Sequence, residues 1–260
     1  MGGYRGRGAG EEEIVRRAVT DKKKPMSEIK KIPKKYQPLG FEILYEDRDI
    51  IVGNKAAGFL TVAAKWNREQ TIHSALNNYV RKGQAKSRKR VYVVHRLDQG
   101  TSGVLIFAKT EHARLFLKDH WKSTVKTYYA IAHGRFAKKS GTISSYLVED
   151  DEYVIHSTRD RAEGKLSHTE YTVLKETDKF SLLKINLLTG RKNQIRVHLA
   201  DEGHPVVGDA KYGKSAPRYK SLALHARSIV ITHPFSGKRL TFEAPVPEYF
   251  RQLVHCQINF

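Results

Sequence analysis

One aspartate stands where a catalytic carboxylate could work. Asp98 lies within VHRLDQGTSGVLIFAKT at 94–110, between apolar runs at 91–94 and 104–108. Short runs rich in β-branched residues and bounded by Gly and Ser indicate two buried strands joined by a loop. Rigid flanks would hold the carboxylate and leave it accessible. There it could stabilise positive charge, form a covalent bond or accept a proton. The same pattern also suits a structural turn, in which the Asp side chain bonds nearby backbone N–H groups.

The elements that would position this loop follow from the periodicity of the apolar residues. Strands outnumber helices and come mostly in hairpins, which predicts the α+β class, with a mixed, mostly antiparallel sheet and flanking helices. We expect strands at 41–45, 50–52, 126–133, 141–148, 165–175, 180–188, 222–233 and 238–244, and helices at 71–80, 111–122, 191–202 and 248–254.

The ends of the chain differ in character from the rest. Residues 1–39 contain Gly-rich and Lys-rich blocks and few large apolar side chains, too few to form a core. We therefore expect a basic flexible arm at 1–39, a folded domain at 40–255 and a short C-terminal tail at 256–260. The arm is either a solvated leader or a segment that adds phosphate contacts.

The composition narrows the class of partner. The 260 residues are 40% hydrophobic, and 47 Lys and Arg against 27 Asp and Glu give a formal net charge of +20. This excess of positive charge predicts a polyanionic partner. A single cysteine, Cys256, excludes an internal disulfide. Because the chain has no run of 18 apolar residues and no signal-peptide core, we expect a soluble cytoplasmic protein that does not bind membranes.

Several cofactor-dependent classes are disfavoured by the sequence. The metalloprotease pattern HExxH, the phosphate-binding loop GxxxxGK[ST] and a strand–GxGxxG–helix unit are all missing. The order HRLD also differs from the HRDL of kinases, and no Asp-Phe-Gly follows. We expect no metal site and no cofactor.

Five stretches resemble, in order and spacing, the motifs of the RluA family of RNA pseudouridine synthases. They are HRLDQGTSGVLIFAKT at 95–110, EDRDIIVGNKAAG at 46–58, KTYYAIAHG at 126–134, LTGRKNQIRVHL at 188–199 and GHPVVGDAKYG at 203–213. The resemblance covers about residues 41–250. It implies the pseudouridine synthase fold for the domain at 40–255, without the extra N-terminal RNA-binding domain of many members, because about 40 residues are too few for one.

The chain departs from the family pattern at two positions. Ala56 stands where the family usually has Pro, and Asn193 stands where it usually has His. An amide keeps the capacity for hydrogen bonding but cannot gain charge.

The resemblance implies isomerisation of specific uridines to pseudouridine in structured RNA, either large-subunit ribosomal RNA or transfer RNA. The bond between ribose C1′ and uracil N1 breaks, and the base is turned and rejoined through C5, without an external reductant or donor. By the resemblance Asp98 is the carboxylate at C1′/C2′ of a flipped-out nucleotide, acting as nucleophile or as base. Tyr128 is implied to stack on the uracil and help remove the C5 proton, and Arg196 to pair with Asp98.

The expected RNA contacts come from the resemblance and from a run of charge. Arg96 is implied to displace the target base, and RKGQAKSRKR at 81–90 holds six Lys or Arg in ten residues. That run is either a clamp on the RNA backbone or a solvated loop. The expected RNA-binding residues are Arg81, Lys82, Lys86, Arg88, Lys89, Arg90, Arg96, Lys126, Arg191 and Asn193.

Residues near Arg196 are expected to share its helix or to support the site. Arg191, Gln194 and His198 are expected on one helix face, with His198 as a structural hydrogen-bonding group. Asp209 and Tyr212 are interpreted as supporting structure.

Two other functions remain open at this stage. One is a catalytically idle RNA-binding protein on the same scaffold, which would not need Asp98, Tyr128 and Arg196 together. The other is a glycosidase or N-glycosylase, which would normally need a second carboxylate or a positioned water. No second Asp or Glu lies near Asp98 in its motif, although distant acids could approach in the fold. A monomer is expected, since no dimerisation feature is visible.

Overall fold

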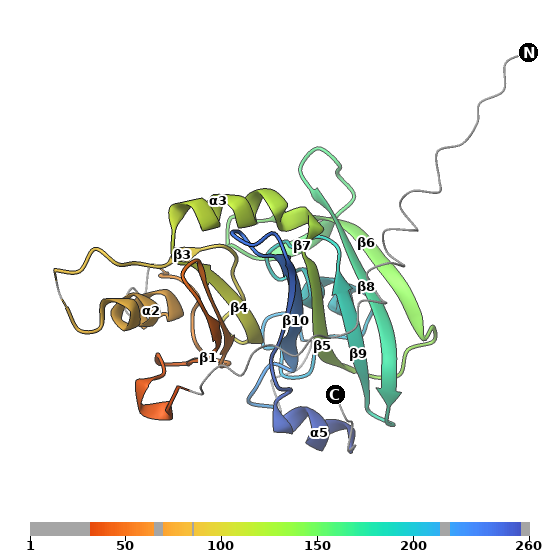
Figure 1. The fold of residues 1–260 in the computed structure, drawn as a ribbon. Helices are drawn as coiled ribbons and strands as arrows, with labels where there is room; N and C mark the ends of the chain where they lie inside the picture. Colours follow the sequence, from red (N-terminus) through yellow and green to blue (C-terminus); the bar gives the residue numbers. More distant parts are fainter. Residues whose placement is uncertain (1–31, 65–69, 85, 214–218, 256–260) are drawn as a thin grey trace, which may run out of the picture. The chain divides into compact units, whose positions relative to one another are not determined.

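The computed structural model describes residues 32–64, 70–84, 86–213 and 219–255 (Figure 1). Its centre is an eleven-stranded sheet in the order β1-β2-β4-β10-β5-β9-β8-β6-β7, with β11 beside β10 and β3 beside β4. The β4–β10 pair is parallel and the other pairs are antiparallel. The predicted α+β class with a mixed, mostly antiparallel sheet is confirmed.

The elements follow the expected order along the chain. The strands are β1 (Phe41–Glu46), β2 (Ile50–Lys55), β3 (Tyr92–Val93), β4 (Ser102–Ala108), β5 (Val125–His133), β6 (Ser140–Glu149), β7 (Ile155–Thr158), β8 (Lys165–Glu176), β9 (Phe180–Leu187), β10 (Leu224–Thr232) and β11 (Arg239–Glu243). The helices are α2 (Ile72–Arg81), α3 (Glu111–Asp119), α4 (Gln194–Asp201) and α5 (Glu248–Val254), with 3-10 turns η1 (Lys34–Tyr36) and η2 (His120–Ser123). None of the helices in the described ranges has the length and apolar character needed to cross a bilayer.

The strand that follows the Asp98 loop is buried along its whole length. All seven residues of β4 are buried, and its side chains pack into core clusters on both faces of the strand. Leu105 and Phe107 belong to the same core cluster as Ile72 and Leu76 of α2. Val104 and Ile106 point to the other face, into a cluster that includes Leu117 of α3. A strand packed on both sides gives the loop before it a rigid base.

The helix that contains Arg196 begins later than the sequence pattern suggests. Asn193 adopts a left-handed conformation with φ 53°, and α4 starts at Gln194 instead of Arg191. The expectation that Arg191 shares a helix face with Gln194 and His198 is therefore wrong. Arg191 is exposed before the helix, whereas Gln194 and His198 are buried and both contact Thr169 Oγ1.

The predicted arm is only partly within the described residues. Residues 1–31 lie outside them. Ile32 packs against the core, and the Gln37 side chain accepts a hydrogen bond from Ile43 N at 2.8 Å. Contacts with the sheet thus begin several residues before Gly40. The predicted tail, 256–260, also lies outside the described part.

Two fully buried histidines should make stability depend on pH. His198 contacts Ser145 and Thr169, and His225 contacts Ser102 Oγ at 2.8 Å. Burial lowers the pKa of each to about 4. Below the unfolded value of about 6.5 only the unfolded chain takes up these protons, so stability falls as the pH drops from 6.5 toward 4.

The test is urea unfolding of the wild type and His225→Gln at pH 5.0, 6.0 and 7.0. In the variant, the slope of the unfolding free energy against pH should be smaller than in wild type by up to about 1.4 kcal/mol per pH unit. His112→Gln, at an exposed histidine of α3, is the matched control and should keep the wild-type slope. An unchanged slope in His225→Gln would mean that His225 is not held neutral.

Candidate active site

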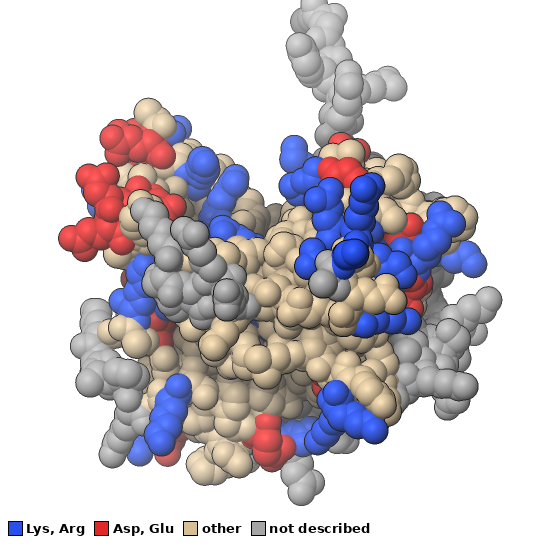
Figure 2. Space-filling model, turned by 90° about the vertical axis from the view of Figure 1, so that its left-hand side faces the viewer, with Lys and Arg blue, Asp and Glu red and all other residues tan. Residues whose placement is uncertain are grey.

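The three residues expected to be catalytic line one cleft. Asp98 comes from the loop before β4, Tyr128 from β5 and Arg196 from α4, and the cleft has a volume of about 1250 Å³. Figure 2 shows a hollow in the surface of the protein that is flanked by Lys and Arg side chains. A cleft of this size can admit a nucleotide that has left its stack.

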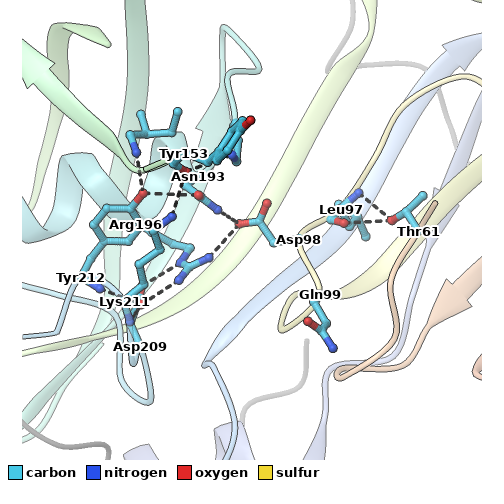
Figure 3. A network of polar contacts seen from close by, with 12 residues as sticks. Thr61, Leu97, Asp98, Gln99, Tyr153, Asn193, Arg196, Asp209, Lys211 and Tyr212 are labelled. Carbon is cyan, nitrogen blue, oxygen red and sulfur yellow. Dashed lines mark hydrogen bonds and ion pairs between the residues drawn. The ribbon is translucent and has the colours of Figure 1, made fainter. Parts of the chain in front are cut away.

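The Asp98 carboxylate is held through one of its oxygens. Oδ2 accepts hydrogen bonds from Asn193 Nδ2 at 2.6 Å and from Arg196 Nη1 at 3.2 Å (Figure 3). The pairing of Asp98 with Arg196 that the resemblance implied is present. The contact with Asn193 was not expected from the sequence, which placed that residue among the RNA contacts.

Arg196 lies between two carboxylates. Its Nε and Nη2 donate to Asp209 Oδ2 and Oδ1 at 2.7 and 2.8 Å, while Nη1 reaches Asp98. The Tyr212 ring lies against the guanidinium, 5.1 Å from it. Burial would lower the pKa of Arg196, but the two carboxylates raise it well above its usual range. The guanidinium is therefore a permanent charge with a fixed orientation.

Asp209 supports the site but is not available to react. Its side chain is fully buried, and its oxygens accept two bonds from Arg196 and further bonds from the backbone N–H groups of Lys211 and Tyr212 at 2.9 and 3.0 Å. Burial raises the pKa of Asp209, yet these donors bring it below its usual value. Oδ1 accepts three of these bonds and Oδ2 accepts one, so both oxygens are engaged. The supporting role predicted for Asp209 agrees with this geometry.

The backbone on both sides of Asp98 is anchored to the segment after β2. The Lys55 ammonium is fully buried and donates to the carbonyls of Ala56, Phe59 and Gln99 at 3.0, 2.8 and 3.0 Å. Burial lowers the pKa of Lys55 to about 7, an effect that the Asp98 charge opposes. The Thr61 hydroxyl donates to Leu97 O and accepts from Leu97 N. Both neighbours of Asp98 are thus fixed, which fixes where its side chain begins.

Tyr128 forms part of the cleft wall. It is 9% exposed, and burial, with a smaller effect of Asp98, raises its pKa above the usual range. The phenol therefore stays neutral and offers an apolar face to a base. The adjacent Tyr129 is half-buried and packs against the same core cluster that contains Tyr128.

Half of the expected RNA contacts meet at the cleft. Arg90, Arg96, Lys126, Arg191 and Asn193 line it, and Arg96 is exposed two residues before Asp98. The other five lie at the end of α2 and in the loop that leads to β3, outside the lining. They are Arg81, Lys82, Lys86, Arg88 and Lys89.

The helix α3 and the turn η2 contribute a basic wall that was not predicted from the sequence. Arg114 and Lys118, spaced i and i+4 on α3, line the cleft together with Trp121. The Trp121 ring lies 4.8 Å from the His95 ring and 5.6 Å from Lys126 Nζ. The i, i+4 spacing of the two cations was visible in the sequence, but only the fold shows which way that helix face points.

One group of potential metal ligands exists among the described residues, away from the cleft. It consists of Asp47, Asp49 and His233. His233 Nδ1 accepts the backbone N–H groups of Phe235 and Ser236, so Nε2 carries the proton and donates to Asp47 at 2.7 Å. Asp47 also accepts the Tyr45 hydroxyl and the backbone N–H groups of Asp49 and Ile50. The bonds of Asp47 and His233 are those of a structural turn.

Comparisons with known proteins agree on one family. The profile described as RNA pseudouridylate synthase matches residues 49–201. The chain is 36% identical over 226 residues to YhcT of Bacillus subtilis, named an uncharacterized RNA pseudouridine synthase, covering 84% of this chain and 72% of that protein. It is 36% identical over 236 residues to ribosomal large subunit pseudouridine synthase D of Nitrosomonas europaea, covering 86% and 67%. The solved structure of human RNA pseudouridylate synthase domain containing 4 has the same fold, with a TM-score of 0.70, 23% identity and coverage of 82% and 91%.

Proposed function

The chain belongs to the RluA family of RNA pseudouridine synthases, and from this premise we propose how its cleft acts on RNA. It is an isomerase that converts uridine in RNA to pseudouridine. The observation that carries the proposal is the placement of Asp98, Tyr128 and Arg196 in one basic cleft. A protein that only bound RNA would not need a carboxylate, which repels phosphate, at the centre of such a cleft.

Asp98 is proposed to act at the ribose of a flipped-out uridine. Breaking the glycosidic bond builds positive charge at C1′, and a carboxylate beside it stabilises that charge, whether it then attacks C1′ or removes the C2′ proton. Arg196 orients Asp98, and Tyr128 provides the surface on which the freed uracil can turn. Arg96 is proposed to fill the place of the extruded base, because it is exposed beside Asp98.

The substrate is proposed to be large-subunit ribosomal RNA, with transfer RNA as the alternative. The name of the Nitrosomonas europaea relative favours the first. Extrusion of a base costs about a few kcal/mol, which contacts with the surrounding phosphates must offset. The cations at the cleft and in the loop at 81–90 are proposed to make those contacts. A cytoplasmic location and a monomeric state stay predictions.

Base-resolution mapping of pseudouridine tests the proposed function. Unmodified ribosomal and transfer RNA are incubated with purified protein or with Asp98→Ala. One new site with the wild type alone supports the proposal and identifies the substrate. Tight binding without any new site on either RNA would favour the idle RNA-binding protein. Release of free uracil would favour an N-glycosylase.

The basic wall of α3 gives a prediction about salt. Arg114→Gln/Lys118→Gln should weaken RNA binding and flatten its dependence on salt, since each lost phosphate contact removes roughly 0.7–0.9 from the slope of log K against log salt concentration. Filter binding between 50 and 200 mM salt measures the slope. Lys179→Gln/Lys238→Gln removes two exposed charges outside the cleft lining and should leave the slope close to wild type. Equal slopes for the two double variants would exclude α3 from the RNA path.

A further inference from the structure

Both donors to the Asp98 carboxylate reach the same oxygen. Asn193 Nδ2 and Arg196 Nη1 lie 2.6 and 3.2 Å from Oδ2. Within the described ranges no donor is bonded to Oδ1. The Asp98 side chain is 25% exposed. Two donors on one oxygen fix the rotation of the carboxylate and leave the other oxygen free in the cleft.

The amide of Asn193 is itself oriented from behind. Its Oδ1 accepts the Tyr212 hydroxyl at 3.3 Å, and the Tyr212 oxygen accepts the backbone N–H of Ile155 at 3.2 Å. Because Ile155 donates to that oxygen, the Tyr212 proton is free to point at Asn193. If the amide turned over, it would place its oxygen against the Asp98 carboxylate and its N–H groups against Tyr212. The chain Ile155–Tyr212–Asn193–Asp98 therefore selects one orientation.

The Asn193 side chain does not cap α4 and is therefore available to bond Asp98. The residue precedes α4 but makes no capping hydrogen bond, and its φ of 53° is one that Asn tolerates better than most residues. An amide has no proton to lose near neutral pH, so its bond to Asp98 persists across that range. A histidine, which the family resemblance places here, would titrate.

We infer that Asn193 is a positioning residue for Asp98, that Tyr212 orients it, and that Oδ1 is the oxygen presented to the ribose. The inference rests on the proposed function and deepens it. Where the family pattern has His at position 193, this chain therefore has a neutral donor to the reacting carboxylate.

Asn193→Asp is the sharpest test because it changes one NH₂ group to oxygen. Near pH 8 two carboxylates face each other, and the single-turnover rate at saturating enzyme should fall about 100-fold. Toward pH 5.5 the two acids can share a proton, which restores a donor to Oδ2. The rate relative to wild type should then recover by about 10-fold. A purely structural role would give a ratio that does not change with pH.

A matched control exists on β9. Asn186 Nδ2 donates to Glu170 Oε2 at 2.7 Å, the same kind of contact outside the cleft lining. Asn186→Asp should leave the rate at all pH values within about twofold of wild type. Tyr212→Phe keeps the ring against Arg196 and removes only the hydroxyl. It removes the bond to Asn193 Oδ1 and the bond from Ile155 N. The rate should fall about 3- to 10-fold with unchanged RNA affinity, because Asn193 loses the bond that orients it.

Exchanging the side chains of Asp98 and Asn193 tests the contact between them in the absence of RNA. Asn193→Asp should lower Tm by about 3–6 °C at pH 7.5, and adding Asp98→Asn should restore most of the loss, because an amide again faces a carboxylate. Additive losses in the double variant, or a rate ratio for Asn193→Asp that is flat with pH, would overturn the inference. Failure of the proposed function looks different, since the wild type would then form no pseudouridine while the exchange still restored Tm.

Discussion

Asp98→Ala should reduce pseudouridine formation on the order of 10⁴-fold, the size of loss expected when the central group of a catalytic unit is removed. Glu152 is the other carboxylate in the described lining of the cleft, but it is exposed, and Arg196 bonds Asp98 and Asp209 instead. Asp209 also bonds Arg196, but its side chain is fully buried, and both oxygens already accept bonds, from Arg196, Lys211 N and Tyr212 N. Single-turnover assays on the mapped site measure the loss.

The same substitution should leave the protein folded and able to bind RNA. Arg196 keeps its two bonds to Asp209, and Lys55 still anchors the backbone at Gln99, so the cleft retains its shape. Removing a negative charge from a cleft for a polyanion should keep the affinity equal or raise it slightly. Asp178→Ala, at an exposed acid in the β8–β9 turn, is the control and should match wild type in both assays. Turnover by Asp98→Ala within tenfold of wild type would remove Asp98 from its proposed role.

Arg196→Gln should lose both stability and activity. The substitution leaves Asp209, whose side chain is fully buried, without its cation, and breaking a buried pair in this way costs about 3–5 kcal/mol. It also removes one of the two donors to Asp98 Oδ2. Urea unfolding at pH 7 measures the first effect, and single-turnover assays measure the second.

A second substitution separates the two effects. Arg196→Gln/Asp209→Asn replaces the buried ion pair by two amides, which should recover much of the stability because no uncompensated charge stays buried. Activity should not recover, since Asp98 still lacks the guanidinium. Arg251→Gln, which breaks an exposed i, i+3 pair with Glu248, should cost no more than about 0.5 kcal/mol. If the double variant regained activity with stability, Arg196 would serve only the fold.

The Asp209 contribution should disappear in acid. Its pKa in the folded protein is below the usual value, so its stabilisation is fully present above the unfolded pKa and is lost as the pH falls through the folded one. The difference in unfolding free energy between wild type and Asp209→Asn should therefore shrink below about pH 4.

Local patterns in the sequence predicted most of the strands and helices. A short continuous apolar run marked β4, and alternation of apolar residues marked the hairpins. The helix α2 begins close to the predicted start at residue 71, where Thr71 accepts a bond from Ser74 N. Such signals are local, because the period of side chains along a strand or helix depends only on neighbours in the chain. The motif resemblance added the family and the trio Asp98, Tyr128 and Arg196.

Only the tertiary structure decided which groups hold Asp98. Asn193 lies 95 residues from Asp98 in sequence. Its left-handed backbone makes α4 begin at Gln194, so the helical spacing from which the position of Arg191 was predicted does not apply. Likewise, the face of α3 with Arg114 and Lys118 became a cleft wall because the neighbouring face, with Leu117, packs on β4. Contacts between distant segments depend on how the sheet brings strands and helices together, and no periodicity along the chain records that arrangement.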